Sequence, residues 1–403
     1  MKKLMLLGGS RYLRPVIKEA RELGLYIITC DYLPDNYAHK YADKYLNISI
    51  VDKDAVLEAA KAEGIDGIMS FACDPGVVTG AYVAEKLGLP YGGSYESVSI
   101  LQDKGRFRAF LTEHGFNVPK SASFSSGESI EKVMEAIEGF RRPIIVKPVD
   151  SAGSKGVRRV DEDGEIPSAI ENALASSICG RFIIEEFIVQ EGFASDTDCF
   201  SNDGELVFAS FNNQRFDAQA DNPYTPAGFT WPSTMPERFQ KELRSELQRL
   251  LHLLDMKSTV YNIESRLGTD GRAYLMEVSP RGGGNRLCEM VQYASGVNLI
   301  RNAVKAAVGM KIEELSDPVY DGAWAYVVVH SDRAGIFKGL DVAPELEKKI
   351  IERDMWVQPG DRVEAFTGAN KTIGTLVVRF DAQEEAAERM ADIRGWVKVI
   401  TEE

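Results

Sequence analysis

Cysteine and histidine are scarce in this 403-residue chain, and neither forms a motif. The five cysteines are dispersed, odd in number and without a Cys-x-x-Cys pair, so neither a disulfide framework nor a structural zinc site is supported. The four histidines are equally scattered, and a histidine-rich metal site is not expected. We therefore expect reduced thiols in a cytoplasmic protein.

Long apolar runs and an excess of basic residues are also missing. No apolar stretch reaches the ~18 residues that suggest a membrane-spanning helix, and the apolar run near the N-terminus is too short for a signal peptide. The formal net charge is −14, from 47 basic and 61 acidic residues. Such a charge opposes non-specific nucleic-acid binding but leaves room for a locally basic pocket. We expect neither a membrane nor a nucleic acid as partner.

The first ninety or so residues alternate between strand and helix patterns. The expected strands are 4–7, 26–30 and 67–71, and the expected helices are 15–23, 54–62 and 77–87. This alternation predicts a parallel sheet with helices on both faces, which binds ligands beyond the carboxyl ends of its strands. Gly8-Gly9-Ser10, Asp31 and Asp74 are thereby placed near a crevice.

A dinucleotide-binding fold is one interpretation of this region, with Asp31 as the ribose-binding acid. The glycine fingerprint of such folds is incomplete, because Gly8-Gly9 is followed by Ser10-Arg11-Tyr12 and no third glycine. A nicotinamide oxidoreductase is therefore the weaker alternative.

The most informative pattern predicts a hairpin with two glutamates facing each other. Asp270-Gly271 favours a two-residue type I′ turn, whose central residues both need positive φ. With that turn Glu264 lies directly opposite Glu277, while Tyr274 and Met276 belong to the apolar face. Like charges so placed destabilise a sheet, and two carboxylates are what Mg²⁺ usually takes from a protein beside nucleotide phosphates. A solvated hairpin with exposed charges is the plain alternative.

Two further segments suggest nucleotide binding. Lys147 ends an expected strand and is followed by a flexible loop with Gly153 and Gly156, whose backbone N–H groups can approach phosphate oxygens. The spacing is not that of a P-loop, and a surface hairpin would also explain it. The segment 182–188 runs from a strand into two acids and two apolar residues, and would present main-chain groups to a purine edge. An edge strand is the alternative.

The rest of the chain predicts mixed structure. The expected helices are 102–114, 129–140, 237–255 and one near 384–393, the expected strands are 143–149 and 182–185, and 211–236 is expected to be a long ordered loop. Beyond about residue 315 the pattern is one of short strands and turns.

The order of these segments resembles the ATP-grasp superfamily over nearly the whole chain. The resemblance rests on Asp103-Lys104, Lys147 with its glycine loop, Glu185 to Ile188, Glu264, and Glu277-Val-Ser-Pro-Arg281-Gly-Gly. The 360–374 stretch is similar to the C-terminal domain of carboxylase and purine-pathway members. The 147–157 and 277–283 stretches are similar to carbamoyl-phosphate synthase large subunits and amino-acid ligases.

This resemblance implies an α/β and α+β multidomain protein with the ATP-grasp fold. The implied regions are an N-terminal Rossmann-like domain at 1–93, an ATP-grasp domain at 94–312 with a small lobe at 94–182 and a large lobe at 183–312, and a C-terminal β-rich domain at 313–403. It also implies a ligase that uses ATP and Mg²⁺ (or Mn²⁺) to activate a small-molecule carboxylate as an acyl phosphate and join it to an amine.

The resemblance further implies roles for particular residues. ATP contacts are expected from Lys104, Lys147, Ser151, Gly153, Ser154, Gly156, Glu185, Glu186, Phe187, Ile188 and Glu191. Metal ligands are expected at Glu264, Glu277 and Ser279, catalytic groups at Lys147 and Arg281, and substrate contacts at Arg281, Gly283, Asn285 and Arg286. The 211–236 loop, with Asn213, Arg215, Asp217, Tyr224 and Trp231, either shapes a substrate pocket or simply packs on the surface.

The chain departs from the family pattern at two of these positions. Ser279 stands where family members usually have Asn, and serine is a shorter and weaker metal ligand. Glu191 is the expected ribose-binding acid, although the residues around it do not align cleanly.

Two other functions compete with the carboxylate–amine ligase. One is a purine-pathway-like enzyme that uses formate or bicarbonate, favoured by the C-terminal stretch. The other is a non-catalytic ATP-binding regulator, which has no need for both Glu264 and Glu277. Because many ATP-grasp enzymes are dimers, a homodimer is a further expectation.

Overall fold

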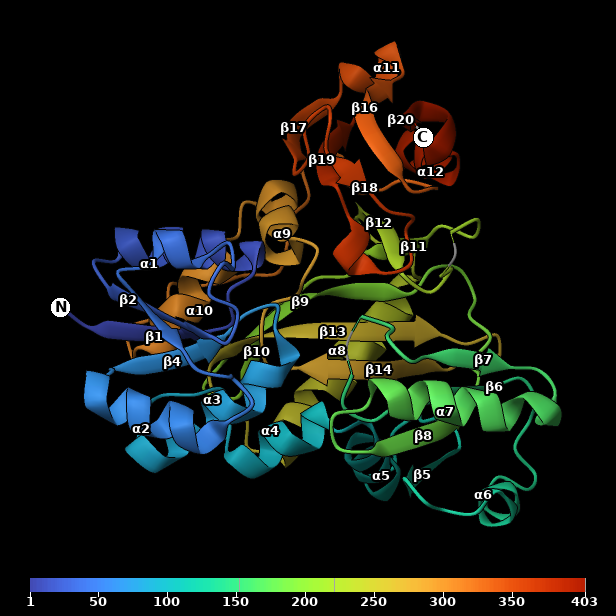
Figure 1. Ribbon diagram of the computed structural model, residues 1–403, viewed down its shortest axis with the longest axis horizontal. Coiled ribbons are helices and arrows are strands. Elements are labelled where there is room, and N and C mark those ends of the chain that lie inside the picture. Colours follow the sequence, from blue (N-terminus) through green and yellow to red (C-terminus); the bar gives the residue numbers. More distant parts are fainter. Residues whose placement is uncertain (152, 221, 403) are drawn as a thin grey trace.

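The computed structural model describes residues 1–151, 153–220 and 222–402. A parallel sheet near the N-terminus is followed by antiparallel sheets, as the α/β and α+β expectation requires (Figure 1). Within the described ranges, none of the helices combines the length and apolar character needed to span a membrane.

The N-terminal sheet places its strands in the order β3-β2-β1-β4, all parallel. Its elements are β1 (Lys3–Leu7), α1 (Arg14–Glu22), β2 (Tyr26–Asp31), β3 (Lys44–Asn47), α2 (Lys53–Glu63), β4 (Gly67–Ser70) and α3 (Asp74–Leu87). Alternate residues of β1 serve opposite layers, since Leu4 and Leu6 pack with α1 while Met5 and Leu7 pack with α2 and α3. The expected strands and helices of this region are present, and β3 adds a strand that the pattern did not predict.

A helix from far along the chain completes this N-terminal core. Helix α10 (Leu299–Ala307) packs beside α1, and Ile300 and Val304 join the cluster that contains Leu4 and Leu6. Figure 1 shows α10 next to α1 and β1. The first ninety residues therefore share their core with the end of the expected ATP-grasp region.

The next segment forms an antiparallel sheet in the order β5-β8-β6-β7. Its elements are α4 (Tyr95–Gln102), α5 (Lys104–Glu113), β5 (Ser121–Ser125), α6 (Ile130–Ala136), β6 (Ile144–Pro148), β7 (Arg158–Val160), α7 (Ile166–Ser176) and β8 (Arg181–Glu186). The helix expected at 102–114 begins at Lys104, because the Asp103 side chain accepts the Arg106 N–H and caps it. The helix expected at 129–140 already ends at Ala136.

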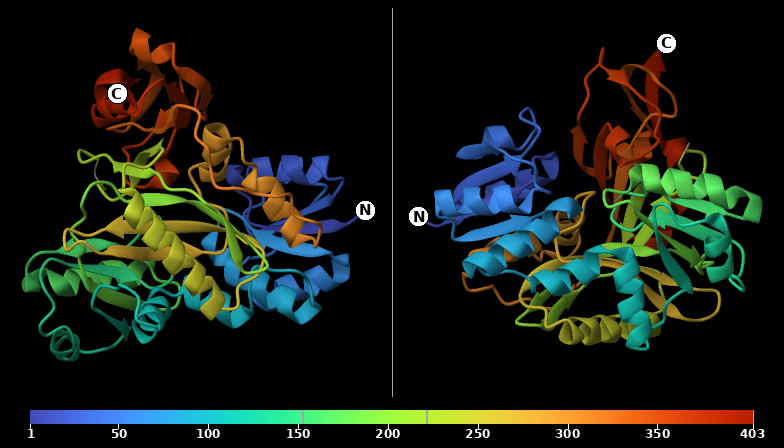
Figure 2. Two further views of the ribbon diagram at one scale, coloured as in Figure 1. Left: turned by 180° about the vertical axis from the view of Figure 1, so that it is seen from behind. Right: turned by 60° about the horizontal axis from the view of Figure 1, so that its bottom comes forward.

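The large sheet has the order β10-β9-β13-β14 and is antiparallel. Its elements are β9 (Ser195–Asn202), β10 (Glu205–Ala209), α8 (Glu237–Leu253), β13 (Thr259–Leu267), β14 (Ala273–Ser279) and α9 (Leu287–Ser295). Leu243 and Leu247 of α8 pack against Ile263 and Val278, so one face of the sheet is apolar. Figure 2 shows α8 lying across this sheet when the molecule is seen from behind.

The segment 211–236 is not the long loop expected from its composition. It contains β11 (Asn213–Phe216) and β12 (Pro226–Trp231), and β12 pairs with β15 (Ala323–Val329). Phe229 and Trp231 are buried against Tyr326, a partner almost 100 residues away that local composition does not reveal. This sheet therefore crosses residue 312, where the sequence suggested a domain boundary.

The C-terminal residues complete that sheet and add a smaller one. The first has the order β11-β12-β15-β19-β17, with β17 at Ile350–Met355 and β19 at Gly374–Phe380. The second has the order β18-β16-β20, with β16 at Gly335–Val342, β18 at Arg362–Val363 and β20 at Val397–Glu402. The helices here are α11 (Pro344–Glu347), α12 (Gln383–Ala391) and α13 (Ile393–Trp396).

Candidate active site

The polar face of the large sheet carries two rows of side chains across β9, β13 and β14. Direct register partners are Asp196, Glu264 and Glu277 in the first row, and Asp198, Asn262 and Ser279 in the second. Partners directly opposite each other project from the same face of an antiparallel sheet. Glu264 thus faces Glu277 as the hairpin pattern predicted, and Asp196 extends the pair to three carboxylates.

The turn that closes the hairpin differs from the predicted two-residue turn. Gly271 donates its N–H to the Gly268 carbonyl oxygen (2.9 Å) and has φ +75°, while Asp270 is not among the positive-φ residues. This is a type I turn followed by a left-handed residue, the usual three-residue hairpin loop. Such a loop alone would pair Glu264 one residue away from Glu277.

A β-bulge in β14 restores the predicted pairing. Glu264 pairs with Glu277, but Ser265 pairs with Leu275, so β14 has one extra residue between these pairs. Leu275 therefore joins the core, whereas Tyr274 turns away and donates its hydroxyl to Asp270 (2.6 Å). The prediction that Tyr274 belongs to the apolar face was wrong because the bulge could not be read from the sequence.

Lys147 is held by a buried ion pair. Its Nζ lies 2.7 Å from Glu185 Oε2, and Arg108 Nε lies 2.7 Å from Oε1, although that N–H is not directed at the oxygen. Burial alone disfavours the charge on Glu185, but Arg108 and Lys147 outweigh it and lower the pKa of Glu185 to about 2. Burial lowers the pKa of Lys147 against the pull of Glu185. The Glu185 side chain orients Lys147, so any adenine contact here would involve the backbone.

Two further cations lie beside the carboxylate row. Lys104 Nζ donates to the Ser151 carbonyl oxygen (2.9 Å) and lies 3.6 Å from Glu277 Oε2. Arg266 shares a face with Glu264, and its Nη2 lies 2.7 Å from Glu264 Oε1. Burial opposes the charge on Glu264, but Arg266 and Lys147 keep its pKa below the usual value. Glu264 is therefore ionised, and both expected metal ligands face cations.

Arg281 is clamped by an acid from the N-terminal sheet. Its Nε and Nη2 donate to the two oxygens of Asp74 (2.9 and 2.8 Å), and Nη1 donates to Asn262 Oδ1 (2.9 Å). Asp74 is the first residue of α3, at the carboxyl edge of the parallel sheet where the sequence placed it. Both side chains are largely buried, so a substrate anion at Arg281 would compete with Asp74.

Ser279 is already engaged by its neighbours. Its hydroxyl donates to Asp74 Oδ1 (2.9 Å) and accepts from Gln102 Nε2 (2.7 Å), and the residue is completely buried. These two bonds leave one lone pair on the hydroxyl oxygen. Direct metal ligation by Ser279 stays a prediction, and the geometry favours a role in holding Asp74.

The glycines after Arg281 are required by close packing. A Cβ on Gly282 would lie 2.2 Å from the Phe71 ring, and one on Gly283 would lie 2.9 Å from both Asp198 Oδ1 and Asn262 Nδ2. The Gly283 N–H donates to Asp198 Oδ1 (2.9 Å). This segment joins the polar face of the large sheet to the end of β4.

Asn285 and Arg286 follow in left-handed conformations, with φ +49° and +56°. Arg286 is ion-paired with Glu289 (2.9 Å) and with Glu352 of β17. It therefore lies away from Arg281, on the side of the segment that faces the C-terminal strands.

The glycine loop after Lys147 contacts the segment between β11 and β12. Gly153, Ser154 and Gly156 have positive φ, and the Ser154 hydroxyl donates to the Tyr224 carbonyl oxygen (3.1 Å). Ala152, within the same expected phosphate loop, lies outside the described residues. The sequence suggested five residues of the 211–236 segment that could shape a substrate pocket. Within the described part of the chain, Tyr224 is the one of these five that forms a hydrogen bond with the glycine loop.

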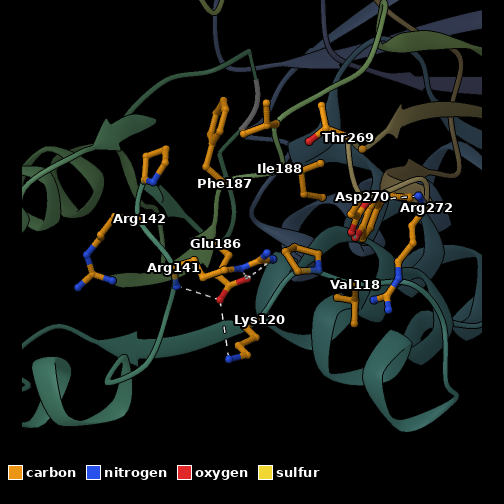
Figure 3. A pocket seen from close by; sticks show the side chains of 15 residues that line it. Val118, Lys120, Arg141, Arg142, Glu186, Phe187, Ile188, Thr269, Asp270 and Arg272 are labelled. Carbon is orange, nitrogen blue, oxygen red and sulfur yellow. Dashed lines mark hydrogen bonds and ion pairs between the residues drawn. The ribbon is translucent and has the colours of Figure 1, made fainter.

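Glu186 points to the face of its sheet opposite Lys147. It accepts the Arg141 N–H (3.0 Å) and is ion-paired with the Arg141 and Lys120 side chains. Figure 3 shows these groups around a cavity of about 290 Å³, with Phe187 and Ile188 on its wall and Asp270 across it. Only the backbone of Glu186 can therefore serve a nucleotide on the Lys147 side. Glu191 is exposed and donates its N–H to the Leu267 carbonyl oxygen (2.8 Å), and ribose binding by its side chain stays a prediction.

The other residues singled out in the 211–236 segment support structure. Trp231 is completely buried, and the Asn213 amide donates to the Thr230 hydroxyl (3.0 Å). Arg215 stacks on Phe193, 4.4 Å from the ring centre. Asp217 accepts from His330 (2.9 Å) and Arg394 (2.8 Å), and the same arginine pairs with Asp332. Asp217, His330 and Asp332 lie close enough to bind a metal, but Arg394 already pairs with both acids.

Asp196 and Asp198 are the site residues that sequence reasoning missed. Burial raises the pKa of Asp196 to about 8, with a further contribution from the Glu264 charge, and burial raises the pKa of Asp198 to about 6. Asp198 Oδ2 is buried without a hydrogen-bond partner in the described part of the chain. The alternating Ser-Asp-Thr-Asp pattern at 195–198 was the available signal. Strand pairing with β13 was needed to interpret it.

The carboxylate row fits a divalent cation. Glu264 and Glu277 supply carboxylate oxygens, and the acidic side chains of Asp196 and Asp198 lie beside them, the latter with an Oδ2 that has no partner among the described residues. Hard cations such as Mg²⁺ prefer oxygen ligands of this kind. Burial, and after it the charge of Glu264, raises the pKa of Asp196, and a bound cation would oppose both effects.

Comparison with known families matches two parts of the chain. Residues 17–91 match the ATP-grasp N-terminal domain, and residues 140–289 match the ATP-grasp domain. The carbamoyl phosphate synthase large chain of Pseudothermotoga lettingae is 26% identical over 298 residues, which is 73% of this chain and 26% of that protein. The chain thus spans about a quarter of that relative's length.

Solved structures resemble the chain over its whole length. L-amino acid ligase from Bacillus licheniformis has a TM-score of 0.80 at 19% identity, covering 100% of this chain and 99% of that one. The biotin carboxylase domain dimer of Hydrogenobacter thermophilus 2-oxoglutarate carboxylase, in complex with MgADP and bicarbonate, has a TM-score of 0.75 at 15% identity, covering 99% and 91%. These likenesses confirm the expected fold.

Proposed function

Because the chain belongs to the ATP-grasp family of carboxylate–amine ligases, we propose that it uses ATP to join a small-molecule carboxylate to an amine. The observation that carries the proposal is the row Asp196, Glu264 and Glu277 beside Lys104 and Lys147. Phosphoryl transfer depends on positioning and charge neutralisation, and this face supplies both signs of charge.

The described residues have distinct parts in the proposed reaction. Glu264 and Glu277 would hold Mg²⁺, with Mn²⁺ as a substitute, and the metal would neutralise charge on the ATP phosphates. Two lysines would contact those phosphates. Lys147 is oriented by Glu185, and the Nζ of Lys104 donates to the Ser151 carbonyl oxygen at the start of the glycine loop. Ser151, Gly153, Ser154 and Gly156 would cover the phosphates with backbone N–H groups. The backbone from Glu186 to Ile188 would contact adenine.

Arg281 would act on the acyl phosphate. In the structure its guanidinium donates to Asp74, Asn262 and the Gly282 carbonyl oxygen, so an anion would compete with Asp74 for it. The proposed exchange places a negative substrate group beside the N-terminal sheet. Gly283 would let that substrate approach, because any side chain there would meet Asp198 and Asn262.

A bicarbonate- or formate-using reaction is the second candidate, supported by the likeness to a carboxylase domain bound to bicarbonate. The non-catalytic alternative is disfavoured, because a row of half-buried acids placed directly opposite one another destabilises the sheet. We extend the proposal to a cytoplasmic enzyme with small-molecule partners and without nucleic-acid or membrane partners. A homodimer is also proposed, and light scattering on the eluting protein tests it.

The proposal is tested by ADP and phosphate release from ATP and Mg²⁺ across amino acids, sugar acids, formate and bicarbonate, each with and without an amine. We expect release that depends on one acid–amine pair. Glu277→Gln should lower that rate at least about 100-fold, because a metal ligand is lost while the charge-neutral side chain keeps its shape. Circular dichroism should show the fold unchanged.

Glu171→Gln is the matched control, because Glu171 is exposed on α7 and distant in sequence from the row. It should keep the wild-type rate. Near-normal activity of the Glu277 variant would remove the metal assignment.

A further inference from the structure

A second cavity lies where three distant parts of the chain meet. It measures about 730 Å³ and is lined by residues of 11–41, 286–293 and 352–356, which bring together α1, α9 and β17. Figure 1 shows these three elements converging between the N-terminal sheet and the C-terminal strands. A volume of this size suits a small organic ligand.

The lining of this cavity is basic in a protein of net charge −14. Its basic side chains are Arg11, Arg14, Lys18, Arg21, Arg286 and Arg353, and its acidic side chains are Glu289, Glu352 and Asp354. Two of these three acids form ion pairs, since Glu289 and Glu352 both pair with Arg286. Arg353 pairs with Glu347 outside the cavity lining.

Three cations of the cavity form no ion pair in the described part of the chain, although Arg14 also acts on the Glu352 charge from a longer distance. Among the described residues, Arg11, Arg14 and Lys18 have no carboxylate within ion-pair distance, while the nearest carboxylate oxygen to Arg21 is 3.9 Å away. Arg14 and Lys18 are also exposed, and both lie at the beginning of α1. The positive end of the α1 dipole adds to their charge.

Aromatic rings form the walls beside these cations. The Arg11 guanidinium lies between Tyr37 and Trp356, 4.9 and 4.1 Å from the ring centres. Arg14 lies 5.9 Å from the ring centre of Tyr41. Stacking holds the planar guanidinium by its faces and leaves its edge N–H groups available to an anion.

The cavity is connected to the reactive face by a short segment. Arg281 lies on the polar face and Arg286 lies in the cavity wall, five residues later, so even a fully extended chain separates their Cα atoms by at most ~18 Å. One substrate of sugar-phosphate or nucleotide size can therefore reach both places.

We propose that this cavity binds the phosphate group of a phosphate-ester substrate, whose other end is joined at the carboxylate row. The inference rests on the proposed ligase function and names the substrate class. A phosphate ester carries close to two charges and three acceptor oxygens, which match the three cations without an ion pair better than a single carboxylate does. The aromatic walls suit a ring next to the phosphate.

Calorimetry with phenyl phosphate tests the binding site, using the full chain saturated with ADP and Mg²⁺ so that the nucleotide site is filled. We expect saturable binding that weakens as salt is added. The double variant Arg14→Ala with Lys18→Ala should raise the Kd at least about 10-fold, because two charge-assisted contacts are lost. Its affinity for ADP should be unchanged.

Arg238→Ala with Lys241→Ala is the matched control, because it removes the same two charge types from the exposed face of α8. The control should bind phenyl phosphate like the wild type. Equal weakening in both double variants, equal binding of benzoate, or no binding of phenyl phosphate would each overturn the inference.

Failure of the ligase proposal gives a different result. In that case no acid–amine pair releases ADP, while phenyl phosphate still binds through Arg14 and Lys18. If instead ADP release requires an acid and an amine that both lack phosphate, and phenyl phosphate does not bind, only the phosphate inference falls.

Discussion

Glu185 and Glu186 are neighbours in the chain but occupy opposite environments. The Glu185 carboxylate is 1% exposed and lies between Arg108 and Lys147, which are themselves 2% and 14% exposed. Glu186 pairs with Arg141 and Lys120, whose side chains are 82% and 63% exposed. Successive side chains of a strand point to opposite faces of the sheet, so Glu185 and Glu186 contact different partners although they are the same residue type.

Replacing the buried acid should cost far more stability than replacing its neighbour. Glu185→Gln leaves Arg108 and Lys147 without a counter-charge and should lower the free energy of unfolding by about 3–5 kcal/mol. Glu186→Gln breaks ion pairs to exposed partners and should cost at most about 1 kcal/mol. Urea unfolding monitored by circular dichroism at pH 7 measures both.

The pH dependence follows from the same site. The pKa of Glu185 is lowered to about 2 from 4.5, so its ion pairs contribute stability above pH 4.5 that is lost as the pH falls toward 2. The difference in the free energy of unfolding between the wild type and Glu185→Gln should therefore become smaller below pH 4.5. Equal destabilisation by the two variants at pH 7 would contradict the assigned roles.

At the scale of elements, the turn after β14 connects the large sheet to the N-terminal sheet. The Gly282 carbonyl oxygen accepts the Ala72 N–H (3.0 Å), and Gly283 packs against Asp198 and Asn262. In the hairpin, the three-residue turn shifts the register by one residue and the bulge in β14 shifts it back. Together they place Glu264 opposite Glu277. Short irregular segments therefore determine the geometry of the carboxylate row.

Two adjacent glycines should respond differently to one added methyl group. Gly283→Ala would bring a Cβ within 2.9 Å of Asp198 Oδ1 and 2.7 Å of Leu287 Cδ1, and should cost about 1–3 kcal/mol. It should also lower ligase turnover by shifting the Asp198–Asn262–Ser279 row. Gly284→Ala meets nothing within 4 Å and has no positive φ, so it should be neutral.

Thermal unfolding and ADP release measure the two effects. Equal unfolding temperatures and equal rates of ADP release in the two alanine variants would show that the packing around Gly283 tolerates a side chain.

At the scale of the whole molecule, the regions of the chain are interlocked. Helix α10 completes the N-terminal core, and β12 pairs with β15 across residue 312. Arg11 adds a contact between the N-terminal sheet and the C-terminal strands by stacking on Trp356. These links cross each boundary that the sequence suggested, so the boundaries stay predictions.

Loss of the Arg11 stack should loosen the contact between the N-terminal sheet and β17. Arg11→Ala should speed hydrogen exchange in 350–356 and at the start of α1, since a partly exposed cation–π contact contributes about 1 kcal/mol. Arg389→Ala is the matched control, because Arg389 stacks on Trp396 at 3.7 Å within the C-terminal region. It should leave exchange in α1 unchanged. Unaltered exchange in the Arg11 variant would contradict the proposed link.

Local patterns predicted much of the fold and part of the site. The alternation of the first ninety residues predicted the parallel sheet, and Asp270-Gly271 predicted a hairpin with Glu264 opposite Glu277. The bulge in β14 escaped prediction, because it depends on how Leu275 packs under α8. The strands in 211–236 also escaped, because their partner lies about 100 residues away.

The sequence by itself determined the strand–helix alternation of the first ninety residues, the ATP-grasp resemblance and the hairpin that carries Glu264 and Glu277, since these follow from local patterns along the chain. Only the tertiary structure decided that Asp196 and Asp198 join the row, that Arg108 and Glu185 hold Lys147, and that Asp74 clamps Arg281. Each of these contacts joins residues far apart in the sequence. Long-range strand pairing and burial create these contacts, and local periodicity predicts neither.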